Sequence, residues 1–196
     1  MPGPEQPSTC AASASASSEA GTTPERSLDI ELISGRQWPE AIEQLLRGLP
    51  EWFGIEQSLL DYVEHSRTLP TTATLDVDEV VGACVVRDHF PRSAEIELLA
   101  VRRDRHRQGI GRRLVEHVAG ALRSEGIALL QVKTFGPSGD SPEYELTRTF
   151  YESIGFIPLE ELRELWDEDN PCLILVMPLE AVPSDGGSGF SPPSGP

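Results

Sequence analysis

The feature that most constrains the fold is an alternation of two sequence patterns along the middle of the chain. Between Leu28 and Val182, short runs rich in β-branched residues alternate with stretches in which apolar residues recur every three or four positions. The short runs are typical of strands, and the periodic stretches are typical of amphipathic helices. The alternation predicts an α/β domain, in the broad sense that includes α+β folds.

The same patterns place the individual elements. Short connections between the strands of residues 71–101 favour an antiparallel meander. Helices are expected at Trp38–Arg47, Ile55–Thr68, Gly109–Ser124 and Glu145–Ile154. Strands are expected at Leu28–Ile33, Thr71–Leu75, Val80–Arg87, Ala94–Val101, Leu129–Thr134, Phe156–Trp166 and Cys172–Met177.

The two ends of the chain differ in composition from this middle part. Residues 1–27 are mainly Ala, Ser, Thr, Pro and Gly, and residues 183–196 are mainly Gly, Ser and Pro. Such segments cannot bury enough apolar surface to fold, so we expect two disordered tails around one domain at 28–182. The N-terminal segment lacks a basic start and an apolar run, and no run of roughly 18 apolar residues occurs. We therefore expect a cytoplasmic protein with no membrane partner.

Charge and cysteine usage exclude some functions. The formal net charge is −16, which argues against a nucleic-acid partner because phosphate binding needs a positive surface. Six of the 16 basic residues nevertheless lie between Arg102 and Arg113, which indicates a local anion site. Cys10, Cys84 and Cys172 lie in no spacing that holds zinc or iron, so no metal is expected.

A turn with two glycines, Gln108-Gly109-Ile110-Gly111, connects a predicted strand to a predicted helix. The first N–H groups of a helix have no partner within the helix and face any anion docked there. A dinucleotide site would need glycine at Leu114, and a nucleotide-triphosphate loop would need Gly-Lys-Ser/Thr, which is missing. Taken alone, the turn also fits an arginine-rich helix start without a ligand.

Three segments together resemble the GNAT superfamily of N-acetyltransferases. They are residues 94–101 (AEIELLAV), 106–114 (HRQGIGRRL) and 149–156 (TFYESIGF), in the order and at the separations of that family. The pattern departs at His106, where the family prefers Gln or Arg. The resemblance implies a mixed, largely antiparallel, twisted sheet of about seven strands flanked by about four helices. It also implies acetyl-CoA as co-substrate and an amine as acceptor.

The resemblance carries roles over to individual residues. Residues Leu99, Ala100 and Val101 are expected along the pantetheine arm of acetyl-CoA. Around the pyrophosphate we expect Arg107, Gln108, Gly109, Ile110, Gly111 and Arg112. The acceptor pocket is expected near Trp52, Phe53 and Trp166.

Transfer to an amine requires a proton acceptor, since an ammonium group with a pKa near 10.4 is almost wholly protonated at neutral pH. Glu95 and Glu97 lie two apart on a predicted strand and therefore share one face. The resemblance makes Glu95 the first candidate and Glu97 the substitute, and Tyr151 the proton donor to the CoA sulfur. The alternatives are solvated carboxylates and an ordinary packed tyrosine. His65, His89 and His117 have no catalytic spacing and are expected to be surface or packing residues.

The acceptor and the class of activity are left open by the sequence. Acidic residues around Trp166 favour a cationic acceptor, although the same charges could serve only to keep the protein in solution. Rival hypotheses are a non-catalytic module that binds acyl-CoA and an acyltransferase for protein N-termini or lysines. Many members of the family form dimers, so a homodimer is an alternative to a monomer.

Overall fold

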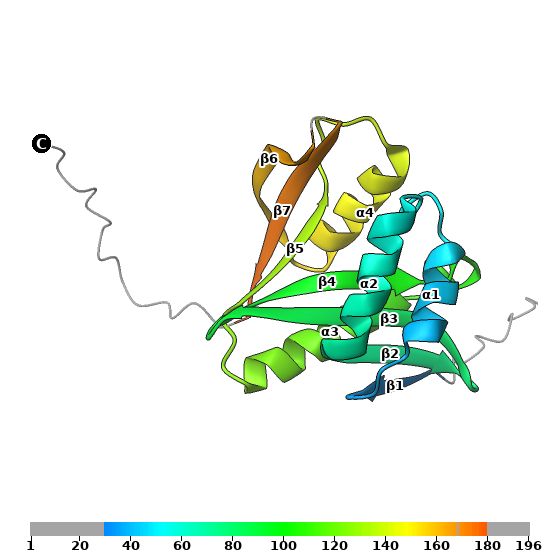
Figure 1. The fold of residues 1–196 in the computed structure, drawn as a ribbon. Coiled ribbons are helices and arrows are strands. Elements are labelled where there is room, and N and C mark those ends of the chain that lie inside the picture. Colours follow the sequence, from blue (N-terminus) through cyan, green and yellow to red (C-terminus); the bar gives the residue numbers. More distant parts are fainter. Residues whose placement is uncertain (1–29, 168, 180–196) are drawn as a thin grey trace, which may run out of the picture.

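A single seven-stranded sheet forms the centre of the molecule in the computed structural model, which describes residues 30–167 and 169–179 (Figure 1). The strand order is β1-β2-β3-β4-β5-β7-β6, and every pair is antiparallel except β4 and β5. The strands are β1 Ile30–Ser34, β2 Thr71–Asp76, β3 Glu79–Phe90, β4 Ser93–Val101, β5 Leu129–Phe135, β6 Ile157–Asp167 and β7 Asn170–Pro178. The predicted sheet and its meander are confirmed, and both predicted tails lie outside the described residues.

Helices cover both faces of this sheet. Helices α1 (Pro39–Arg47) and α2 (Glu56–Thr68) pack on one face, where Ala83, Val85 and Leu98 join their core. Helix α3 (Ile110–Ser124) packs on the other face with Leu114, Val118 and Leu122, the apolar stripe that the sequence predicts. No helix in the described ranges combines the length and apolar character needed to cross a membrane.

An irregularity in β4 opens the sheet next to β5. Val85 pairs with Leu98 but Val86 pairs with Ile96, so Glu97 is an extra residue in β4. Such a bulge bends its strand and interrupts the ladder. Pairing of β4 with β5 ends at Ile96 and Val132, whereas β5 stays paired with β7 as far as Phe135. Beyond that point β4 and β5 diverge (Figure 1).

Helix α4 (Pro142–Ser153) begins three residues before the start predicted from the sequence. The Ser141 hydroxyl accepts a hydrogen bond from the Tyr144 N–H at 3.4 Å, and Pro142 occupies the first helical position. Both residues favour a helix start, and the apolar periodicity alone did not include them. Gly155, just after the helix, has a φ of 103°, a left-handed conformation that glycine adopts at little cost.

Candidate functional site

The turn before α3 exposes a row of backbone donors. Arg107 and Gly109 both have left-handed backbone conformations, with φ of 61° and 79°. The first backbone bond of the helix runs from the Arg113 N–H to the Gly109 carbonyl at 3.0 Å. Within residues 30–167 and 169–179, the N–H groups of residues 108–112 have no acceptor. These donors stand at the positive end of the α3 dipole, which is a site suited to an anion.

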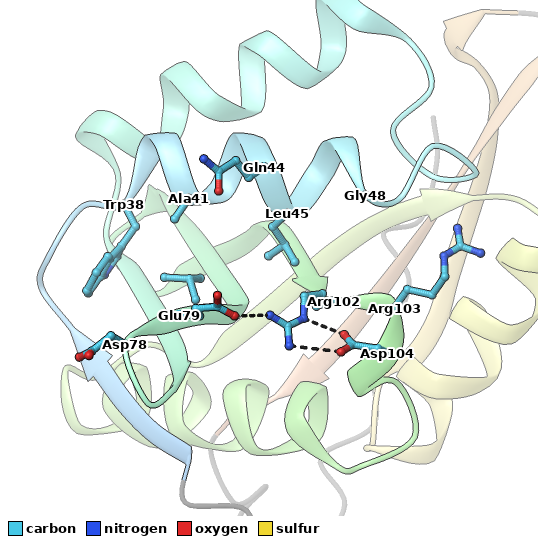
Figure 2. Close-up of a pocket in the computed structure, with 11 residues that line it drawn as sticks. Trp38, Ala41, Gln44, Leu45, Gly48, Asp78, Glu79, Arg102, Arg103 and Asp104 are labelled. Carbon is cyan, nitrogen blue, oxygen red and sulfur yellow. Dashed lines mark hydrogen bonds and ion pairs between the residues drawn. The ribbon is translucent and has the colours of Figure 1, made fainter.

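The predicted anion site of six arginines needs correction, because four of them are paired with acids. Arg102 donates to Asp104 at 2.7 Å and to Glu79 at 2.8 Å (Figure 2). Arg103 pairs with Glu51, and Arg105 pairs with Asp76. Glu79, Glu51 and Asp76 lie 23 to 52 positions from their arginines, so local sequence could not disclose these three pairs. The positive charge next to the exposed amides comes from Arg107 and Arg113, and from Arg112, whose guanidinium lies 3.8 Å from the Glu116 carboxylate.

The paired Arg102 lines a hollow in the described structure. This hollow has a volume of about 690 Å³ and lies between α1, the β2–β3 turn and residues 102–104 (Figure 2). Trp38 and Leu45 form its apolar wall, and Asp78 and Glu79 lie on its rim. Apart from Arg102 and Arg103 of the arginine cluster, none of the residues predicted to bind a ligand or to act in catalysis lines it.

A smaller hollow, of about 100 Å³, lies where β4 and β5 diverge, and we call it the aromatic hollow. It brings together six residues that the sequence predicted for three different roles: Trp52, Phe53, Glu97, Leu99, Tyr151 and Trp166. Five further residues with polar groups, which the sequence did not single out, complete it: Tyr62, Lys133, Thr134, Tyr144 and Thr147. Glu95, Ala100 and Val101 do not line it.

Glu97, the bulge residue, lines this hollow, and two basic side chains lie against its carboxylate. Arg87 donates to its carboxylate through Nε at 2.9 Å and Nη2 at 3.1 Å. The His65 Nδ1 lies 2.7 Å from its Oε1. Burial on its own would raise the pKa of Glu97, but the hydrogen bonds and the positive charge of Arg87, with a smaller contribution from His65, together outweigh it and hold the pKa below its usual value. Glu97 is therefore an ionised carboxylate with only 13% of its side chain exposed.

Glu95 is more deeply buried and makes more hydrogen bonds. Its carboxylate accepts hydrogen bonds from the Lys133 Nζ at 2.8 and 3.0 Å and from the Gln131 Nε2 at 2.8 Å. The His89 Nε2 lies 2.6 Å from Oε2. Burial raises the pKa of Glu95, and the bonds from Lys133, His89 and Gln131 together lower it further than burial raises it. Two histidines that the sequence treated as surface or packing residues thus contact the two candidate carboxylates.

Three tyrosines surround the hollow, and each hydroxyl is neutral at physiological pH. Tyr151 is 5% exposed and packs between Phe150 and Phe156, with ring centroids 5.3 Å apart in both pairs. Burial raises the pKa of Tyr151 far above 10, and that of Tyr62 to about 12. The Tyr144 hydroxyl donates to the Trp52 carbonyl at 3.1 Å, which fixes the loop between α1 and α2 against α4.

His106, the one departure from the family pattern, connects three parts of the site. Its Nε2 donates to the Val101 carbonyl at 2.7 Å. Its ring meets the Trp52 ring edge-on, with centroids 5.8 Å apart. The residue therefore fastens the turn before α3 to the end of β4 and to the wall of the aromatic hollow.

The two cysteines in the described structure are buried and free. Burial raises the pKa of Cys84 to about 12 and that of Cys172 to about 11, so both thiols keep their protons at neutral pH. Within the described ranges no group of three or more His, Cys, Asp or Glu side chains is placed to hold a metal ion.

The fold and the exposed helix start are those of a GNAT-type domain. Residues 70–158 match the sequence model of the acetyltransferase (GNAT) domain, which spans β2 through the start of β6. The matched residues include all three segments that resemble the GNAT superfamily. A comparison with curated proteins gives no significant match.

Several solved structures have the same fold, and the match with this chain covers almost the whole length of each. The ribosomal-protein-S18-alanine N-acetyltransferase from Escherichia coli has a TM-score of 0.63 at 17% identity, with 81% of this chain and 99% of that chain covered. The aminoglycoside 6'-N-acetyltransferase from Enterococcus faecium has a TM-score of 0.62 at 21% identity, with 79% of this chain and 98% of that chain covered. A GNAT family acetyltransferase from Elizabethkingia anophelis with acetyl-CoA bound has a TM-score of 0.57 at 20% identity, with 76% of this chain and 97% of that chain covered. At these identities the likeness establishes the fold.

Proposed function

We propose that the chain transfers an acetyl group from acetyl-CoA to a primary amine by direct attack within a ternary complex. The observation that carries the proposal is the row of unbonded amides at residues 108–112, which begins the helix beside the opening between β4 and β5. The family match and the neighbour from Elizabethkingia anophelis, which has acetyl-CoA bound, support the same ligand.

In this proposal two segments hold acetyl-CoA. The amides of Gln108, Gly109, Ile110, Gly111 and Arg112, with the guanidinium groups of Arg107 and Arg112, surround the pyrophosphate. Leu99, Ala100 and Val101 of β4 follow the pantetheine arm, where β5 no longer pairs with β4. Because the Val101 carbonyl already accepts from His106, we assign most of the backbone pairing to Leu99.

The thioester carbon then lies at the aromatic hollow. The neutral amine nitrogen attacks that carbon, the tetrahedral intermediate collapses, the C–S bond breaks and CoA leaves as a thiolate. The proton lost by the nitrogen passes to Glu97, which we prefer to Glu95 because Glu97 lines the hollow. His65 contacts Glu97 and is 40% exposed, so it links the carboxylate to solvent.

Tyr151 is proposed to stabilise the leaving sulfur. Its raised pKa means that the phenol keeps its proton even beside a thiolate whose conjugate thiol has a pKa near 8.5. The hydroxyl therefore donates a hydrogen bond without full proton transfer. Trp52, Phe53 and Trp166 are proposed to contact the acceptor, as the resemblance implied.

Ligand binding and turnover test the proposal separately. CoA at about a hundred times its dissociation constant should stabilise the fold by about 2.7 kcal/mol, measured as a thermal shift. ATP serves as the control because it carries phosphates without a pantetheine arm. Thiol release from acetyl-CoA should then require a primary amine. Failure of CoA to stabilise the protein would overturn the proposal, and stabilisation without turnover would reduce the protein to an acyl-CoA-binding module.

A further inference from the structure

The walls of the aromatic hollow are its most distinctive property. Six of the 14 residues that line it are aromatic: Trp52, Phe53, Tyr62, Tyr144, Tyr151 and Trp166. They come from the α1–α2 loop, α2, α4 and β6, so rings approach the hollow from several elements. Several are fixed, because Trp52 donates to the Thr147 hydroxyl at 3.1 Å and Phe53 packs edge-on against Tyr62. Fixed rings favour a flat partner that can stack or pack edge-on.

The charges at the hollow are already balanced within the protein. Of the residues that line it, Glu97 and Lys133 are charged, and each is paired: Glu97 with Arg87, and Lys133 with Glu95. These two acids and two bases sum to no net charge. An acceptor with several ammonium groups would bring positive charges into the hollow, and both carboxylates there are already paired with basic side chains. Burying an unpaired charge is costly, so such an acceptor is disfavoured. A single amine, reacting in its neutral form, meets no such cost.

The size of the hollow limits how much of the acceptor can enter. Its volume is about 100 Å³, against roughly 150 Å³ for a protein cavity that binds benzene. Only the amine and the atoms next to it fit beside Glu97. Trp166 is 46% exposed and lines the hollow, so its free ring surface is available to whatever part of the acceptor extends outward.

We infer that the acceptor is a primary monoamine joined by a short chain to one flat ring. The amine enters toward Glu97, and the ring packs against Trp166 and its aromatic neighbours. This inference rests on the proposed acetyl transfer at the hollow, and it names the acceptor class that the resemblance left open.

A matched set of amines tests the inference on the full chain. Thiol release from acetyl-CoA is measured with 2-phenylethylamine, hexylamine, putrescine and spermidine. We expect kcat/KM for 2-phenylethylamine to exceed that for each of the other three by about tenfold, the effect of one well-placed ring contact. Equal or higher kcat/KM for putrescine or spermidine would overturn the inference, and so would equal values for hexylamine.

Two neighbouring residues of β6 supply a variant and its control. Trp166→Ala should raise KM for 2-phenylethylamine about tenfold and leave KM for acetyl-CoA unchanged. Leu165→Ala removes a side chain of similar exposure, 48%, that does not line the hollow, and should change neither constant. An unchanged amine KM in Trp166→Ala would contradict the inference. If CoA produced no thermal shift in the parent protein, the proposed function itself would be wrong. Failure of the acceptor inference and failure of the proposed function are therefore distinguishable.

Discussion

At the scale of single residues, the two carboxylates of β4 differ in what surrounds them. Glu97 lies on the bulge, lines the aromatic hollow and touches His65, which reaches solvent. Glu95 is enclosed by Lys133, Gln131 and His89. A group that exchanges protons needs a path to substrate and solvent, whereas an enclosed ion pair supports the structure. The two residues should therefore respond differently to the same substitution.

Glu97→Gln should lower kcat by about 100-fold, because it removes a proton acceptor and keeps the size of the side chain. KM for acetyl-CoA should stay close to that of the parent protein, whereas the thermal midpoint should fall because Gln cannot replace the ion pair with Arg87. Steady-state thiol release and a melting curve measure these quantities. The assignment is wrong if kcat is retained, or if Glu95→Gln abolishes turnover in a protein that is still folded while Glu97→Gln does not.

Glu95→Gln should act on stability and in a pH-dependent way. The pKa of Glu95 is lower in the folded protein, so its charge stabilises the fold above the unfolded pKa near 4.3, and this contribution is lost as pH falls through the folded pKa. The variant should lose about 1.5–3 kcal/mol at pH 7, the range for hydrogen bonds to a charged group. Denaturant unfolding at pH 7 and pH 4 measures the difference, which should be smaller at pH 4. A difference that grows toward acid pH would contradict the assigned ionisation.

At the scale of elements, the structure requires glycine at the two positions that start α3 for different reasons. Gly109 has a φ of 79°, which other residues adopt only at a cost, and a Cβ there would meet nothing within 4 Å. A Cβ on Gly111 would lie 3.2 Å from the Phe150 Cζ, so Gly111 lets α4 approach α3 closely. The turn therefore serves helix packing as well as the exposed amides.

Glycine-to-alanine substitutions along α3 separate these effects. Gly109→Ala should cost about 1 kcal/mol of folding free energy through its left-handed backbone, and should raise KM for acetyl-CoA by disturbing the amides that follow. Gly120→Ala is the matched control, since Gly120 lies within α3 and a Cβ there meets nothing within 4 Å. It should stabilise the fold by about 0.5–1 kcal/mol with no change in that KM. Equal effects of both variants on KM would argue against the amide row as the binding site.

The elements themselves were largely predictable from periodicity, but their irregularities were not. The stripe of α3 and the meander of β2, β3 and β4 follow from local patterns that tertiary packing reinforces. The early start of α4 had a local signal in Ser141 and Pro142, which the periodicity argument passed over. The bulge at Glu97 had no local sequence signal, since it depends on how β3 and β4 align. Lys133 and His65 could not be assigned to the site for the same reason, because their partners are distant in sequence.

At the scale of the whole molecule, charge is the dominant feature. The formal net charge is −16, and the bases that do occur are often committed to ion pairs, as Arg102, Arg103 and Arg105 are. Exposed pairs of this kind contribute little each, typically under about 1 kcal/mol. Repulsion among the remaining acids acts over longer distances and destabilises the compact state. The balance between these two effects is open to a direct measurement.

Sodium chloride should stabilise this protein. Salt shortens the Debye length from about 30 Å at 0.01 M to about 10 Å at 0.1 M, so it screens long-range repulsion between acids more than close contacts such as that of Arg87 with Glu97. The thermal midpoint at pH 7 should therefore rise by a few degrees between 0.01 and 0.15 M. In a domain of this size, such a rise corresponds to a gain in unfolding free energy on the order of 1 kcal/mol. Sucrose at matched osmolality is the control for effects unrelated to charge. A midpoint that falls over this range would mean that the ion pairs, and not the excess of acids, govern the electrostatic stability of the fold.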